Sequence, residues 1–224
     1  MGRLILVPTP VGNLEDITLR ALEVLKSADC ILAEDTRRTG ILLRHYGIKN
    51  RIITYHQHNE HKKVDTITAM ITGGMTLALV TDAGTPSVSD PGFLLVRACI
   101  QKNIDVETLP GATAFIPALV NSGIPGDRFC FEGFLPHKKG RKKRIAQLQN
   151  ETRTMVFYES PFRIVKLLEE LADVMGPERQ ASVSRELTKI HEETARGSLD
   201  DLLKYFGKSD VKGEIVLVVA GKDK

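Results

Sequence analysis

The pattern of apolar and polar positions predicts two successive series of alternating strands and helices. In the first series, short runs that are apolar on both faces predict buried strands at Leu4–Val7, Cys30–Ala33, Ile52–Tyr55, Leu77–Thr81 and Val106–Leu109. Between them, apolar residues at helical spacing predict helices at Thr18–Ser27, Thr36–His45, Glu60–Thr72 and Gly92–Lys102. Strict alternation of strands and helices predicts an open, mostly parallel α/β sheet.

The second series follows a stretch rich in turn-forming residues, Asn121–Asp127. Its predicted strands are Phe129–Glu132, Thr154–Tyr158, Ala181–Ser184 and Glu214–Val219. Its predicted helices are Arg141–Gln149, Pro161–Val174 and Leu199–Phe206. We therefore predict an N-terminal α/β domain over residues 1–118, a linker over 119–126 and a C-terminal α/β domain over 127–224.

Composition excludes several classes of protein. The 224 residues are 42% hydrophobic and 26% charged, which is typical of a globular protein with its own core. The apolar run Ile215–Ala220 is too short to cross a bilayer, and the N-terminus begins in a predicted strand without an export signal. Three scattered cysteines exclude a disulfide scaffold and a cysteine-rich zinc site. We expect a cytoplasmic protein that does not bind membranes.

The net charge of +3 becomes informative when it is located. Residues 1–118 carry 12 Lys and Arg against 12 Asp and Glu, whereas residues 119–224 carry 19 against 16. Six of the positive charges fall in seven positions: Lys138, Lys139, Arg141, Lys142, Lys143 and Arg144. Such a run is either the solvated start of a helix or a surface that contacts nucleic-acid phosphates, and composition does not decide between them.

Small, rigid loops follow three strands of the predicted first sheet. They are Pro8–Leu14, Thr81–Gly92 and Leu109–Ala114, all rich in Gly, Pro, Ala, Ser or Thr. Because ligands of a parallel sheet bind beyond the carboxyl ends of its strands, three such loops favour a preformed small-molecule cleft. The sequence contains neither G-x-G-x-x-G nor G-x-x-x-x-G-K-[ST], so the usual dinucleotide and P-loop signatures are absent.

Polar residues at other predicted strand ends admit two interpretations each. Asp35 with Arg37 is either a helix N-cap with a surface ion pair or part of a site. His56 and His58 could face one side of an extended segment and bind a metal, but no cysteine or fixed third ligand is near, so we expect no metal. We favour a hydrogen-bonding cluster for a polar substrate. Glu159, beside Arg163, is either salt-bridged scaffolding or a site residue, and we favour the site.

Nine strings give the sequence a specific resemblance that covers nearly the whole chain. They are Val7–Leu14, Ala33–Arg37, His56–Glu60, Asp82–Pro86, Asp90–Gly92, Gly133–Pro136, Phe157–Ser160, Arg185–Lys189 and Lys212–Glu214. With these strings the sequence resembles the tetrapyrrole methylase superfamily of S-adenosylmethionine enzymes. Within it, the chain is similar to the ribosomal RNA small subunit methyltransferase I family, which 2′-O-methylates a cytidine ribose in 16S ribosomal RNA.

The resemblance implies two α/β domains with S-adenosylmethionine in the cleft between them, and a homodimer. The cofactor contacts that it implies are Pro10, Val11, Gly12, Asp82, Ala83, Gly84, Thr85, Gly111, Ala112, Thr113, Tyr158, Leu187 and Gly213. For the reaction, the candidate base, orienting and phosphate-holding groups are Asp35, Arg37, His56, Glu159 and Arg163. Phe162 departs from the family, in which a histidine often precedes this arginine. The basic run 138–144 would then contact small-subunit ribosomal RNA, either naked or assembled in the subunit.

Two other functions remain open at this stage. One is a methyltransferase of the same fold that acts on a tetrapyrrole or on a protein side chain. The other is a non-catalytic RNA-binding or assembly factor. The cofactor-type loops disfavour the second, because a pure RNA binder has no use for them. The strings shared with the RNA methylases and the basic run disfavour the first, because a small macrocycle requires neither.

Overall fold

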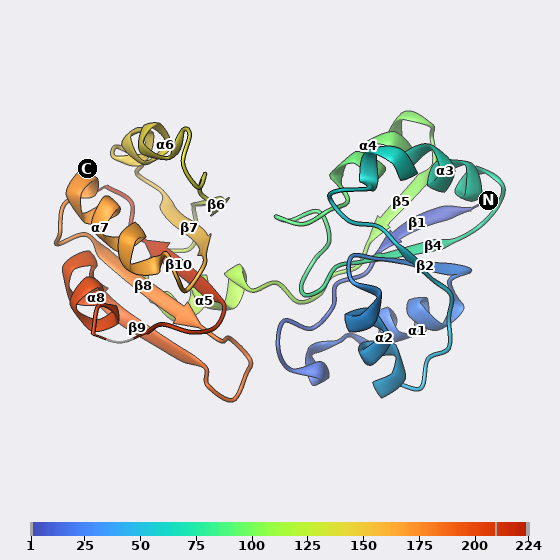
Figure 1. Ribbon diagram of the computed structural model, residues 1–224, viewed down its shortest axis with the longest axis horizontal. Helices are drawn as coiled ribbons and strands as arrows, with labels where there is room; N and C mark the ends of the chain where they lie inside the picture. The colour runs from blue at the N-terminus through green and yellow to red at the C-terminus, as the bar shows by residue number, and fades with distance from the viewer. Residues whose placement is uncertain (1, 209, 223–224) are drawn as a thin grey trace. The chain divides into compact units, whose positions relative to one another are not determined.

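The computed structural model describes residues 2–208 and 210–222, and the chain divides into two compact units, Met1–Thr113 and Ala114–Lys224 (Figure 1). Each unit is an α/β layer structure with one five-stranded sheet. No helix among the described residues has the length and apolar character needed to span a bilayer.

The first unit holds an entirely parallel sheet in the order β3-β2-β4-β1-β5. Its strands are β1 (Arg3–Leu6), β2 (Cys30–Ala33), β3 (Ile52–Thr54), β4 (Leu77–Val80) and β5 (Asp105–Thr108). Its helices are the 3₁₀ turn η1 (Leu14–Asp16) and the α-helices α1 (Leu19–Ser27), α2 (Thr36–His45), α3 (Glu60–Thr72) and α4 (Phe93–Gln101). The mostly parallel sheet predicted from the alternation is this one.

Alternate residues of each central strand supply two separate cores. Ile5 and Ile31 pack in one core with Leu25 of α1 and Leu43 of α2, whereas Leu32 packs on the other face. That second core contains residues of α3 and α4, so helices cover both faces of the sheet (Figure 1). This double coverage explains why the strands appear in the sequence as continuous apolar runs.

The second unit holds a mixed sheet in the order β6-β7-β10-β8-β9. Its strands are β6 (Phe129–Phe134), β7 (Thr154–Glu159), β8 (Gln180–Arg185), β9 (Glu193–Ser198) and β10 (Ile215–Val219). Its helices are α5 (Phe115–Ser122), α6 (Arg141–Leu148), α7 (Ile164–Met175) and α8 (Leu199–Phe206). Only the β6–β7 pair is parallel, and the other three pairs are antiparallel.

Two elements of the second unit were not predicted. Helix α5 extends into the predicted linker, and its residues Ala118 and Leu119 are buried against Val156 and Val216 of the second sheet. The two compact units divide at 113/114, within the range predicted for the N-terminal domain. Strand β9 is an edge strand without large apolar residues, so periodicity did not reveal it.

Candidate active site

Hydrogen bonds join three of the predicted loops at the carboxyl edge of the first sheet. The Thr9 N–H donates to the Gly84 carbonyl at 3.0 Å, and the Gly84 N–H donates back to the Thr9 carbonyl at 2.8 Å. The Thr9 hydroxyl donates to the Thr81 carbonyl at 3.1 Å, and the Thr85 hydroxyl donates to the Ala112 carbonyl at 3.0 Å. The loops after β1, β4 and β5 therefore form one rigid edge.

Two glycines allow close approach of backbone within this edge. A Cβ on Gly111 would lie 2.6 Å from Cβ of Pro8, so only glycine fits there without displacing a loop. Gly84 has φ +79°, and a Cβ on it would meet only the Ala112 carbonyl at 3.7 Å. Gly84 thus adopts a left-handed conformation and leaves open space beside the backbone.

Asp82 connects this edge to the loop after β2. Its Oδ1 accepts a hydrogen bond from the Asp35 N–H at 3.1 Å. Its Oδ2 lies 3.3 Å from the guanidinium of Arg38, which is largely exposed. The carboxyl ends of β2 and β4 are neighbours in the sheet, which is why residues 47 positions apart meet here.

Asp35 and Arg37 form the helix N-cap and ion pair that were one of the two interpretations of the sequence. Asp35 is the N-cap of α2, and its Oδ1 accepts from the Arg37 N–H at 2.8 Å. The Arg37 side chain donates to both oxygens, from Nε at 3.1 Å and from NH2 at 2.7 Å. These bonds from Arg37 hold the pKa of the Asp35 carboxyl well below its usual range, so this group is a poor proton acceptor at neutral pH.

Three carboxyl groups gather beside these loops, and two of them were not singled out from the sequence. Burial, together with the neighbouring Glu34 and Asp82 carboxylates, raises the pKa of Asp90 to about 7. Burial and then Asp82 also raise the pKa of Glu34. Glu34 and Asp90, the two residues not singled out, lie in strings that carry the family resemblance. That position was the only indication in the sequence that they belong to the site. We refer to Glu34, Asp82 and Asp90 as the carboxyl cluster.

His56 lies at the margin of the carboxyl cluster, where its charge interacts with Glu34. Its Nδ1 is buried and has no hydrogen-bond partner among residues 2–208 and 210–222. The rings of His56 and His58 meet edge to face with their centroids 5.9 Å apart. Across the described part of the chain, no three His, Cys, Asp or Glu side chains are grouped so as to hold a metal ion.

In the second unit, Glu159 ends β7 as a buried carboxylate with every oxygen engaged. Its Oε1 accepts from Arg163 Nε and from the Ser160 N–H, both at 2.8 Å. Its Oε2 accepts from NH1 of Arg141 at 3.3 Å, and Nε of Arg141 donates to Glu170 of α7 at 2.6 Å. Arg163 NH1 lies 2.5 Å from Nδ1 of His137. Glu159 and Arg163 are therefore parts of a buried ionic network.

The predicted basic run separates into three kinds of residue. Arg141 is 5% exposed and belongs to the buried network, so its guanidinium does not face solvent as an RNA contact would. Arg144 is half exposed and forms a bidentate pair with Glu132. The remaining members are exposed on the surface: Lys138, Lys139, Lys142 and Lys143.

The cofactor contacts predicted in the second unit lie in its strands or close to their ends. The Tyr158 ring packs against Phe131 and Phe134 at centroid distances of 5.1 and 5.5 Å. Leu187 is 5% exposed, in a turn whose neighbour Glu186 accepts a hydrogen bond from the Glu214 N–H at 3.0 Å. Gly213 packs so closely on Glu186 that a Cβ would lie 2.4 Å from its Cγ.

Comparisons with known proteins agree with this architecture. Residues 3–203 match the family of tetrapyrrole (corrin/porphyrin) methylases. Uroporphyrin-III C-methyltransferase from Thermus thermophilus, solved in complex with S-adenosylhomocysteine, has the same fold, with a TM-score of 0.69 over 98% of this chain and 97% of that one at 19% identity. The chain is thus a methylase of the tetrapyrrole type.

Two curated relatives narrow the family. Ribosomal RNA small subunit methyltransferase I of Synechocystis sp. is 49% identical over 99% of this chain and 80% of its own length. The protein of the same name from Thermotoga maritima is 44% identical over 100% of both chains. This chain belongs to the ribosomal RNA small subunit methyltransferase I family.

Proposed function

We propose that this protein transfers a methyl group from S-adenosylmethionine to the 2′-hydroxyl of a cytidine ribose in 16S ribosomal RNA of the small subunit. The observation that carries this proposal is the 44–49% identity, over nearly the whole chain, to relatives named for that RNA. The carboxyl edge of the first sheet supports it, because its hydrogen-bonded loops can hold a small molecule without rearrangement.

The residues of the first unit fit a cofactor of this chemistry. S-adenosylmethionine supplies a methyl group activated by its sulfonium charge. The open space beside Gly84 would admit a flat ligand, and the Asp82 carboxylate offers an acceptor for hydroxyl or ammonium groups. We assign S-adenosylmethionine binding to Pro10–Gly12, Asp82–Thr85 and Gly111–Thr113. We assign further contacts to Tyr158, Leu187 and Gly213 of the second unit.

Proton removal from the ribose hydroxyl is assigned to the carboxyl cluster with His56. A carboxyl group with a pKa of about 7 is half ionised at neutral pH, so Asp90 is a better base than Asp35. The unpartnered Nδ1 of His56 is free to accept or donate at the same place. Asp35, Arg37, Glu159 and Arg163 become positioning residues, because their charged groups are engaged with one another or with neighbours.

We further propose that Lys138, Lys139, Lys142 and Lys143 contact the RNA backbone. All four are exposed and lie on or just before α6, whose start is anchored by the buried Arg141. Each contact with a phosphate adds affinity that falls as salt rises. We expect the protein to be cytoplasmic. We also expect a homodimer, which light scattering of the purified protein would test.

One labelling experiment tests the proposed reaction. The protein is incubated with methyl-labelled S-adenosylmethionine and either naked 16S ribosomal RNA or unmodified small subunits, and the label is mapped by nuclease digestion. Label in one cytidine ribose is the expected result. Label on a base or on a ribosomal protein side chain, or cofactor binding without transfer, would contradict the proposal.

A further inference from the structure

A second positively charged segment lies in the half of the sequence that is neutral as a whole. Residues 36–59 contain 5 Lys and Arg and 3 His but no Asp or Glu. The rest of residues 1–118 then has 7 Lys and Arg against 12 Asp and Glu. The neutral total therefore conceals a segregation of charge, and the segment comprises α2, the following loop and β3.

The exposed residues of α2 lie on one face of the helix. They are Arg37, Arg38, Ile41, Arg44 and His45. At about 100° per residue these positions fall within an arc of roughly 120°. Arg37 and Arg38 pair with Asp35 and Asp82 at the candidate active site. Beyond them, Arg44 and Lys49 are exposed and have no ion pair with any residue that the structure describes.

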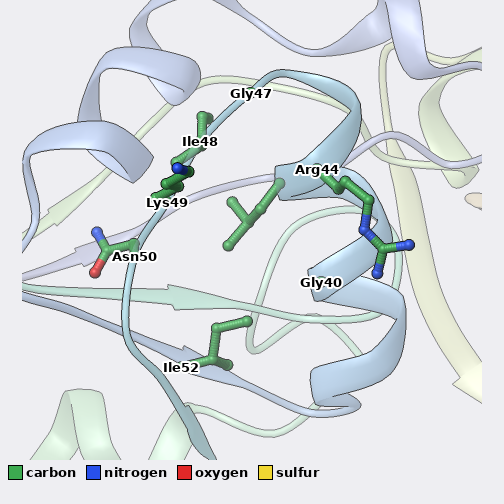
Figure 2. Close-up of a pocket in the computed structure, with 8 residues that line it drawn as sticks. Gly40, Arg44, Gly47, Ile48, Lys49, Asn50 and Ile52 are labelled. Carbon is green, nitrogen blue, oxygen red and sulfur yellow. The ribbon is translucent and has the colours of Figure 1, made fainter.

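A surface hollow of about 540 Å³ lies beside Arg44 and Lys49 (Figure 2). Its lining includes the apolar side chains of Leu43, Ile48 and Ile52, and Gly40 of α2 leaves one wall open. A Cβ on Gly40 would meet nothing within 4 Å. Figure 2 shows Arg44 and Lys49 on opposite sides of this apolar lining. An apolar hollow flanked by two cations fits a nucleobase and the phosphates on either side of it.

We propose that this hollow binds an unpaired nucleotide of the substrate RNA, with the base over Gly40 and Ile52 and the phosphates near Arg44 and Lys49. Leu43 and Ile48, which are 3% and 6% exposed, form the floor beneath them. The proposal rests on the proposed function, because it extends the RNA path from the active site. Helix α2 begins at Thr36 beside the carboxyl cluster, and its 10 residues span about 15 Å. Its exposed basic face thus leads from the reacting ribose to the hollow.

Charge favours RNA over a second copy of this chain as the occupant. A two-fold symmetric contact brings the same surface of both copies together. Here it would place Arg44, Lys49 and the equally exposed Arg51 opposite the same cations, in a segment without a carboxylate. RNA phosphates provide the missing negative charge.

Binding of naked 16S ribosomal RNA, measured by filter retention over a range of salt concentrations, tests the proposal. In Arg44→Glu/Lys49→Glu, loss of two phosphate contacts should weaken binding roughly 10- to 30-fold near 0.1 M salt and lower the salt slope by about 1.4. The matched control is Lys62→Glu/Lys166→Glu, which reverses two exposed lysines on α3 and α7 and should change binding much less. Gly40→Leu fills the hollow without changing charge, and it too should weaken binding.

Several results would overturn the inference. One is equal binding by the Arg44/Lys49 variant and its control, and another is wild-type affinity in Gly40→Leu. A third is a change of oligomeric state in sedimentation of the Arg44/Lys49 variant, which would assign this face to contact between copies. The labelling experiment on the unaltered protein tests the proposed reaction separately, so failure of either proposal is distinguishable from failure of the other.

Discussion

Arg141 and Glu159 form an ion pair whose two side chains are only 6% and 1% exposed, with NH1 of the arginine 3.3 Å from Oε2 of the glutamate. The pair links the first residue of α6 to the last residue of β7. Both residues stand out in the sequence, one in a basic run and one in a family string. Their burial together assigns them to the support of the basic segment rather than to direct contact with RNA or substrate.

Removal of one member of this pair should therefore destabilise the protein strongly. We expect Glu159→Ala or Arg141→Ala to lower the free energy of unfolding by about 3 kcal/mol. Arg141 keeps its pair with Glu170, and Glu159 keeps its pair with Arg163, but in each variant a buried charged atom loses its hydrogen-bond partner. Urea denaturation followed by circular dichroism measures this. As a control, Arg153→Ala breaks the partly exposed pair with Glu151 and should cost less than about 1 kcal/mol. Similar losses in both variants would contradict the buried-pair argument.

Asp90 should make stability fall as pH rises. Its pKa is raised from 3.8 to about 7 in the folded protein, so between these values the folded state binds more protons than the unfolded state. Stability contributed by the protonated group is thus present below about pH 4 and lost by about pH 7. The difference in melting temperature between Asp90→Asn and the unaltered protein should therefore shift in favour of the variant from pH 5 to pH 8. Thermal melts of both proteins at both pH values measure this.

Methyl transfer by the same variant separates a functional role from a structural one. If Asp90 accepts the ribose proton, Asp90→Asn loses most of its turnover while it retains cofactor affinity. Asp105→Asn, at an exposed position that begins β5, serves as the control and should retain both. Full turnover by Asp90→Asn would remove Asp90 from the proposed mechanism.

Asp35 should matter as a cap more than as an acid or base. Asp35→Ala removes the side chain that caps α2 and should cost about 1 kcal/mol of stability, whereas Asp35→Ser retains a capping oxygen and should cost much less. We expect methyl transfer to follow stability in this series. A serine variant of normal stability that has lost turnover would restore Asp35 to the reaction itself.

Gly111 tests the rigid edge of the first sheet. In Gly111→Ala the new Cβ would lie 2.6 Å from Pro8, so the loop after β5 must move away from the loop after β1. We expect weaker binding of S-adenosylmethionine in titration calorimetry, with the fold retained. Gly40→Ala is the control, since its Cβ meets nothing within 4 Å and Gly40 lines the hollow beside Arg44 rather than these loops. Unchanged affinity in Gly111→Ala would argue against these loops as the cofactor site.

The four exposed lysines near α6 should dominate the salt dependence contributed by the second unit. Replacement of Lys138 and Lys139 by Ala, or of Lys142 and Lys143, should lower the slope of log affinity for RNA against log salt by about 1.4 for each pair. Lys62→Ala/Lys166→Ala provides a comparison with the same loss of charge. An unaltered slope in both test pairs would identify the run as a solvated helix start.

Much of the fold was predictable because local rules and tertiary packing agree. Helices α2, α3 and α8 and strand β2 begin and end at the predicted residues, since caps and apolar runs mark them clearly. Thr18 caps α1, and Gly47 takes the left-handed conformation after α2. Helix α5 and strand β9 escaped prediction because their stability comes from the sheet on which they lie, not from their own pattern.

The sequence by itself determined the alternation of elements, the family and the loops at the carboxyl ends of the strands, because each depends on residues that are close together in the chain. Only the tertiary structure decided what the charged residues do. Glu34, Asp82 and Asp90 come together from separate positions, and burial, together with their mutual repulsion, raises the pKa of Asp90 to about 7. Arg141 is adjacent in sequence to exposed lysines, yet it is buried by α7 and β7. Burial and pairing between distant residues set the chemistry of a charged group, and neither is encoded in any local pattern.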